Sequence, residues 1–309
     1  MTLFSREEII AQLKQGKSFN KAELSGINLE GVNLDKGNFA EAYLRRANLS
    51  KASCQGTDFS GAFLILANLS NANLSQAKLR WAELNTAYLD SVNIEEADAT
   101  GVNLFGAKLD RFKGRSAILK KADLRQASGS FLNLSGANFA AAMLDRVNLS
   151  EVNFSDANFR KATGVAAKFA KVVGTKANLE QVNFSQSNLI DADFSGASLL
   201  AADFTGCYLS SAILREAELL EVTLKQAKLE NVNLTNASLF AANLEGASLS
   251  QVNLTGANLQ DANLENTIWD GVNFSDCNVI GAVFTNAAGL REEEIQWLQN
   301  NGALNVPVS

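Results

Sequence analysis

Residues 27–49 read INLEGVNLDKGNFAEAYLRRANL, and a small, a polar and a large apolar residue recur in them every five positions. The pattern keeps its phase from Phe19 to Gly289. Of its 55 large positions, 45 hold Leu or Phe, and 45 of the positions two residues earlier hold Ala or Val. Asn or Asp occupies 28 of the 55 positions between them. The repeating unit is therefore [Ala/Val]-[Asn/Asp]-[Leu/Phe]-x-x.

A period of five residues fits neither an amphipathic helix nor a coiled coil. The first three residues of the unit alternate apolar, polar, apolar, which predicts a very short strand with one buried face. The next two predict a corner, and 14 of the 21 glycines fall on its second position, where a positive φ costs glycine little. Strand and corner in alternation predict a β-solenoid with coils about 4.8 Å apart around a column of Leu and Phe.

Stretches such as Ala47-Asn48-Leu49, Ala67-Asn68-Leu69 and Ala257-Asn258-Leu259 carry the A(N/D)LXX signature. The chain thereby resembles the pentapeptide-repeat protein family. The resemblance implies an all-β fold, a right-handed quadrilateral β-helix with four units per coil and about 14 coils. The large residue and the Ala or Val before it would point inward, and the other three outward. The family is abundant in photosynthetic bacteria, which implies a bacterial host.

Composition excludes several classes of function. The chain has no histidine, a net charge of −6 and no recognisable catalytic or nucleotide-binding motif, so we expect no enzyme, metal or cofactor site and no direct binding of nucleic acid. Cys54, Cys207 and Cys277 are widely spaced and fall on inward positions, which predicts small buried side chains. With no signal peptide at the first residues and no long apolar run, we expect a cytoplasmic protein without membrane contact.

Both ends of the repeat region predict short helical caps. Ser5-Arg6-Glu7-Glu8 is a capping box before Ile9, Ile10 and Leu13, which predicts a helix over 5–15. Leu290, Ile295 and Leu298 lie near helical spacing before Asn301-Gly302, which predicts a second helix over 291–300. With the β-helix over 17–289 between them, we expect residues 1–309 to form a single domain.

Faults in the repeat cluster in its middle. The centre positions are nearly empty at Ala99, Gly114, Gly129, Gly164 and Gly174. One interpretation is compensation, in which Phe112, on a position normally held by Ala or Val, fills the space left by Gly114. The other is that residues 111–116 and 163–175 leave the coil as loops.

Charge is also uneven in this region. Residues 108–176 contain 13 Lys or Arg and 5 Asp or Glu, a net of +8 in an acidic chain. If each coil has 20 residues, basic side chains of different coils share corners and could attract an acidic protein surface. The alternative is that they only keep the solenoid soluble. The candidate partner-binding residues are Arg80, Lys108, Arg111, Lys113, Arg115, Lys120, Lys121, Arg160, Lys161, Lys168 and Lys171.

Outward aromatic residues are few. Tyr43, Phe63, Tyr88 and Tyr208 occupy the middle position of the unit and Trp81 a corner, and we expect no aromatic patch. The recurrent Asn of the middle position predicts hydrogen bonds around the corners or between stacked Asn side chains.

Two functions follow from these patterns. The first is a non-enzymatic scaffold that binds a protein partner through its outer faces. The second is implied by the resemblance: some pentapeptide-repeat proteins mimic DNA, bind DNA gyrase and protect the topoisomerase from quinolones. The basic middle segment would interrupt the acidic surface that such a mimic needs.

Overall fold

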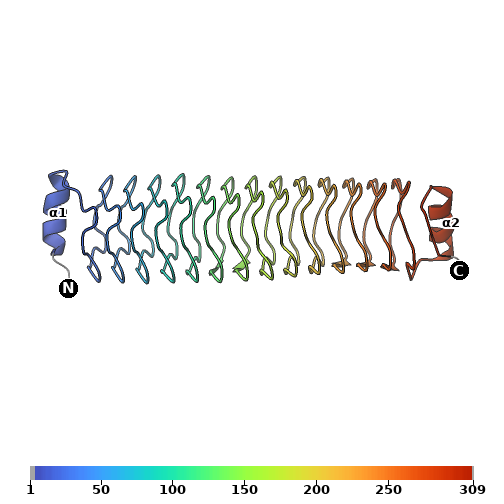
Figure 1. The fold of residues 1–309 in the computed structure, drawn as a ribbon, viewed down its shortest axis with the longest axis horizontal. Helices are drawn as coiled ribbons and strands as arrows, with labels where there is room; N and C mark the ends of the chain where they lie inside the picture. The colour runs from blue at the N-terminus through green and yellow to red at the C-terminus, as the bar shows by residue number, and fades with distance from the viewer. Residues whose placement is uncertain (1–3, 308–309) are drawn as a thin grey trace. The chain divides into compact units, whose positions relative to one another are not determined.

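The structure is a computed structural model that describes residues 4–307. It forms two compact units, unit 1 (Met1–Asn158) and unit 2 (Phe159–Ser309). Within each unit the chain winds into successive coils, and a residue pairs in parallel with the residue 20 positions later, as in Asn28↔Asn48 and Asn183↔Asp203 (Figure 1). Four five-residue strips therefore complete one coil, and the predicted repeat solenoid is observed in both units.

Only a few strips are long enough to count as strands. Unit 1 contains β1 (Ser128–Ser130), which pairs in parallel with β2 (Asn148–Ser150). Unit 2 contains β3 (Lys228–Glu230), β4 (Ser248–Ser250) and β5 (Ile268–Asp270), paired in parallel in that order. Their registers again join residues 20 apart, so the strands are local extensions of the general coil pairing.

Hydrogen bonds to the next coil satisfy the backbone of each corner. At one corner Leu66 N donates to Asn85 O over 3.1 Å, and Ala67 N closes the turn on Leu64 O over 3.0 Å. The second corner residue adopts a left-handed backbone, with φ of 71° at Gly26, as the glycine pattern predicts. Many corners hold other residues there.

The recurrent Asn of the middle position stabilises the corner that follows it. Asn28 Oδ1 accepts a hydrogen bond from Glu30 N over 3.1 Å, which satisfies the first corner N–H. Asn48 Nδ2 also donates to Asn28 Oδ1 over 3.1 Å, so stacked Asn side chains bond between coils. Both predicted roles of this residue are confirmed.

The interior of each unit is almost wholly apolar. The inward Leu, Phe, Ala and Val side chains are buried, and the rings of Phe19, Phe39 and Phe59 stack at 5.3 and 5.5 Å. Where the small inward position is polar, its group bonds to a backbone carbonyl, as Thr57 Oγ1 does to Leu34 O over 2.8 Å. The three cysteines, Cys54, Cys207 and Cys277, are buried free thiols, as predicted.

The faulted strips stay in the coil, so the loop interpretation was wrong. Lys113 N donates to Val92 O and Gly114 N to Asn133 O, both over 2.8 Å. Gly164 N and Gly174 N bond to the next coil over 2.7 Å. These ladder bonds hold residues 111–116 and 163–175 in register with their neighbours.

Compensation explains most of the empty positions. A Cβ on Gly114 would lie 2.8 Å from Leu134 Cδ2 and 3.3 Å from Phe112 Cε1, so Phe112 does fill part of that space. At Gly164 and Gly174 the rings of Phe184 and Phe194, one coil later, fill it instead. Large side chains from neighbouring strips thus replace the missing Leu.

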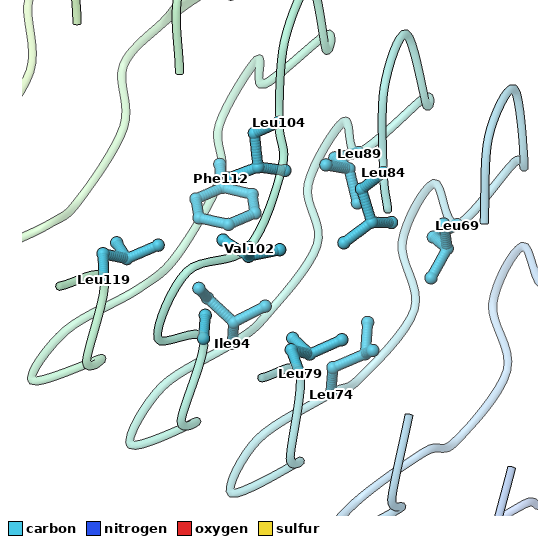
Figure 2. A pocket seen from close by; sticks show the side chains of 11 residues that line it. Leu69, Leu74, Leu79, Leu84, Leu89, Ile94, Val102, Leu104, Phe112 and Leu119 are labelled. Carbon is cyan, nitrogen blue, oxygen red and sulfur yellow. The ribbon is translucent and has the colours of Figure 1, made fainter. Parts of the chain in front are cut away.

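Ala99 is only partly compensated. A cavity of about 10 Å³ remains beside it. Figure 2 shows Ile94, Val102 and Phe112 pointing into this part of the interior. Its walls are apolar, so we expect the cavity to stay dry. The lining side chains are Leu69, Leu74, Leu79, Leu84, Leu89, Ile94, Ala99, Val102, Leu104, Phe112 and Leu119.

Two helices flank the repeats. In unit 1, α1 (Arg6–Lys14) begins at the predicted capping box, where Ser5 Oγ accepts from Glu8 N over 3.1 Å. Leu13 of α1 packs against the backbone of Gly37. In unit 2, α2 (Glu292–Asn300) buries Leu298 and stacks its Trp297 on Phe274 at 5.8 Å. Neither helix is long and apolar enough to cross a bilayer.

Candidate functional site

The candidate cations of unit 1 lie mostly on a single coil. Lys108 to Lys121 span less than one 20-residue turn, so their side chains project from two successive strand segments and from three corners. All are exposed. A flat partner surface could contact only part of this ring, so the six side chains do not form one patch. The residues concerned are Lys108, Arg111, Lys113, Arg115, Lys120 and Lys121.

Ion pairs divide these cations into two groups. Arg80 Nε lies 2.5 Å from Asp98 Oδ2, and Arg115 Nε lies 3.7 Å from Glu95 Oε1. Lys120 and Lys121 have no carboxylate oxygen within 4 Å among residues 4–307. Their charge is therefore available to a partner, whereas that of Arg80 and Arg115 is already offset.

The remaining candidates of unit 1 are also without a carboxylate partner in the described part of the chain. Lys108 Nζ donates to Ser128 Oγ over 3.0 Å, whereas Arg111 and Lys113 make no side-chain hydrogen bond to any residue of 4–307. Asp90 and Asp110 lie at the same corner as Arg111, which lowers the local positive charge.

Unit 2 carries the other four candidates. Arg160 Nε lies 3.3 Å from Glu180 Oε2. Lys161, Lys168 and Lys171 are exposed, and within the described residues no carboxylate lies within 4 Å of them. Lys168 and Lys171 follow each other around one corner, while Lys161 stands on another.

An exposed tryptophan, Trp81, lies at the same corner as the unpaired Lys120 and Lys121. The corner that carries Lys120 and Lys121 holds Arg80 and Trp81 two coils earlier, with Thr100 and Gly101 between them. Trp81 is 60% exposed, and its ring lies so close over Gly101 that a Cβ there would overlap it. Its φ is 55°, a strained conformation for a bulky side chain.

The Asp98 carboxylate holds Arg80 at this corner. Burial alone would raise its pKa, but hydrogen bonds from Thr100 and Arg80 and the charge of Arg80 keep the pKa of Asp98 below its ordinary value. The carboxylate is therefore ionised at neutral pH and orients the guanidinium along the corner.

Sequence profiles identify the family. The profile described as Pentapeptide repeats (8 copies) matches residues 27–65, 67–106, 115–142, 133–163 and 177–216, which is more than half of the chain. A second profile, Pentapeptide repeat region, matches residues 197–284. The chain belongs to the pentapeptide-repeat family. No curated protein sequence matches it significantly.

Three solved structures illustrate what the chain is similar to. QnrB1, a plasmid-mediated fluoroquinolone resistance protein, is 19% identical, with 72% of this chain and 97% of QnrB1 covered at a TM-score of 0.41. HetL of the cyanobacterium Nostoc sp. strain PCC 7120, involved in regulating heterocyst differentiation, is 24% identical, with 92% and 99% covered at a TM-score of 0.21. Rfr23 of the cyanobacterium Cyanothece 51142 is 30% identical over 36% of this chain and 63% of its own length, at a TM-score of 0.17.

Tyr43 and Phe63 form an exposed aromatic patch in unit 1 of this pentapeptide-repeat chain, which the sequence pattern was not expected to produce. Tyr43 and Phe63 stack at 5.0 Å with an interplanar angle of 6°, and both are exposed. Ile65 and Leu66, both half-buried, follow Phe63 at the next corner. The expectation of no aromatic patch was wrong, although the 20-residue separation of Tyr43 and Phe63 already placed them at equivalent positions of successive coils.

The surface offers little for metal or nucleophile chemistry. Within residues 4–307, no group of three or more Cys, Asp or Glu side chains is arranged to hold a metal ion. Burial raises the pKa of the Cys207 and Cys277 thiols to about 12 and raises that of Cys54 as well. These thiols are poor nucleophiles at neutral pH.

Proposed function

We propose that the chain is a non-enzymatic scaffold that binds an acidic protein surface through the corner carrying Trp81, Lys120 and Lys121. The observation that carries this proposal is the combination of a 60% exposed Trp81, fixed over Gly101, with two lysines that lack a carboxylate partner in the described structure. Tryptophan and arginine are enriched among the residues that dominate protein interfaces.

The corner is suited to an acidic partner. Its pairs of residues 80–81, 100–101, 120–121 and 140–141 contain Trp81, the unpaired Lys120 and Lys121, and Arg80, whose charge Asp98 offsets, and they contain no acidic residue. Stacking at about 4.8 Å per coil places Lys121 about 10 Å from Trp81 along the corner. Ladder hydrogen bonds hold this spacing, so little ordering entropy is lost when a partner binds.

The proposal includes the finer architecture that the resemblance implies: a right-handed quadrilateral β-helix of about 14 coils with α1 and α2 as its end caps. Both helices bury apolar side chains against the repeats next to them. Caps of this kind would keep the end coils from pairing with other chains.

A comparative pull-down tests the proposed surface. The wild type, Trp81→Ala and the double variant Lys120→Glu, Lys121→Glu are immobilised, and the recovered proteins are identified and quantified. Glutamate already stands at the second corner position as Glu41 and at the first corner position as Glu30, so both charge reversals should fold. We expect partner recovery to fall in both variants and to persist in Lys228→Glu, a control in unit 2. Equal recovery by all four proteins would remove this corner as the contact surface.

The DNA-mimic alternative is tested separately. The net charge of +8 in residues 108–176 weighs against an uninterrupted acidic surface. We expect no effect of the purified chain on DNA gyrase supercoiling. Inhibition or protection of gyrase that persists in the Trp81→Ala variant would replace the scaffold proposal with the mimic.

A further inference from the structure

An apolar ridge runs along one corner of unit 2. Leu200, Leu220 and Phe240 occupy the first corner position in three successive coils, each 20 residues from the next. Ladder bonds of 2.9 and 3.0 Å join these coils at the corner, from Ala201 N to Leu220 O and from Glu221 N to Phe240 O. Leu200 is 37% exposed, and the other two are half-buried. Most other corners carry Ser, Thr or a charged residue in this position.

The charges around the ridge all have one sign. On this corner and its two flanking strips, residues 198–203, 218–223, 238–243 and 258–263 include four outward carboxylates and no outward Lys or Arg. No basic nitrogen of the described chain lies within 4 Å of these carboxylates. The four are Asp203, Glu218, Glu221 and Asp261.

The distance between the ridge residues indicates which secondary structure a bound partner segment would have. Three coils at about 4.8 Å place the first and third ridge residues about 9.6 Å apart. Apolar residues at i, i+4 and i+7 of an α-helix span about 10.5 Å. Alternate residues of an extended strand span about 13.4 Å over the same three contacts, which is too long. The ridge therefore matches an α-helix and not a β-strand.

The second corner positions leave room for such a helix. Ala201 and Ala241 flank the ridge in left-handed conformations, with φ of 53° each. Because their methyl side chains are short, a helix backbone can approach the surface beside Leu200 and Phe240 without steric overlap.

We propose that this ridge docks a basic amphipathic helix of a partner protein. The helix would set three apolar side chains against Leu200, Leu220 and Phe240 and direct lysines or arginines toward the flanking carboxylates. This surface is opposite in charge to the corner with Lys120 and Lys121, so it would take a different partner.

Fluorescence anisotropy with a synthetic peptide tests the proposal. The probe is a labelled, alanine-based helix of about 18 residues with leucines at i, i+4 and i+7 and flanking lysines. We expect saturable binding to the full chain that weakens by about tenfold or more in the variant Leu200→Ser, Leu220→Ser, Phe240→Ser. Serine stands in this position at Ser195, Ser210 and Ser250, so the variant should fold, and circular dichroism verifies this.

Three controls make the outcome decisive. Tyr208→Asn removes an exposed aromatic side chain from another strip and should leave the affinity unchanged. Glu218→Lys with Glu221→Lys should weaken binding as the serine variant does, and a peptide with the same composition in scrambled order should not bind. Equal binding of the wild type and the serine variant, or of the ordered and scrambled peptides, would overturn the proposal. So would a dimer of the wild type in sedimentation that the serine variant abolishes, because a second copy would then cover the ridge.

Discussion

Replacing Gly114 by leucine restores the commonest residue of its position, yet we expect it to destabilise unit 1. A Cβ at this site would lie 2.8 Å from Leu134 Cδ2 and 3.3 Å from both Ile94 Cγ1 and Phe112 Cε1. Those distances are shorter than the contacts of a packed core, before the rest of the leucine side chain is added. Overpacking of this kind costs about 1–3 kcal/mol.

A second substitution tests the physical reason. Phe112→Ala alone should cost about 3–5 kcal/mol, because it leaves a void in a packed column. In the double variant the new leucine can occupy that void. The combined loss should therefore be smaller than the sum of the single losses, by a coupling energy of about 0.5–3 kcal/mol.

Thermal and urea unfolding followed by circular dichroism measure these changes. For a cooperative unit of this size, each kcal/mol lowers the Tm by about 2–4 °C. Ala99→Cys is the matched control, since Ala99 lines a cavity of about 10 Å³, room for about one small group, and cysteine already occupies the same kind of inward position as Cys54, so the change should not destabilise the unit. A Gly114→Leu variant as stable as the wild type, or single losses that simply add, would refute the reasoning.

Three further predictions concern the corners, a carboxylate and the thiols. Ala141 has a left-handed φ of 57°, so Ala141→Asn should raise the free energy of unfolding by about 0.5–1 kcal/mol, as measured by urea unfolding. The opposite change at another corner, Asn71→Ala, should lower it by a similar amount. If both variants shifted the free energy of unfolding in the same direction, φ would not be the cause. The pKa of Asp98 is lower when folded than when unfolded, so its stabilising contribution is present at neutral pH and is lost as the pH falls through the folded pKa. Arg80→Gln should raise that pKa in an NMR titration, and an unchanged pKa would exclude Arg80 as a cause. The three cysteines are buried, so Ellman's reagent should label them at pH 8 only after denaturation, and rapid labelling of the native chain would disprove their inertness.

The repeat pattern predicted the fold well because each position of the unit has one physical role. Inward and outward positions, corners and both helices followed from apolar periodicity and capping chemistry. The coil length of 20 residues was implied by the family resemblance, since a five-residue period alone does not say how many strips close a coil. Nor could the pattern decide how Gly114 and Gly164 are compensated, because the filling side chains Leu134 and Phe184 belong to the next coil.

The candidate site was predicted only in outline. Counting charges identified the basic segment, but it could not separate Lys120, which has no carboxylate partner among the described residues, from Arg115, whose charge Glu95 offsets. The 20-residue spacing of Arg115 and Glu95 would have indicated that pair. The 18-residue spacing of Arg80 and Asp98 depends on the direction of a side chain at the corner, which a sequence pattern does not encode.

In this repeat, different residues provide stability and binding, and this explains how one chain can carry both proposed surfaces. Stability comes from inward side chains and from ladder bonds that any outward residue can make. Outward residues such as Lys120 and Leu220 can therefore change with little effect on the core, so a surface can be specialised coil by coil. If that is correct, reversing the charge of Lys120 and Lys121 should leave the affinity of the basic peptide for the ridge unchanged, and removing the ridge should leave recovery of the acidic partner unchanged. If either variant lost both the affinity for the basic peptide and the recovery of the acidic partner, the two surfaces would not be independent. The two proposed sites would then have to be replaced by one site with a shared partner.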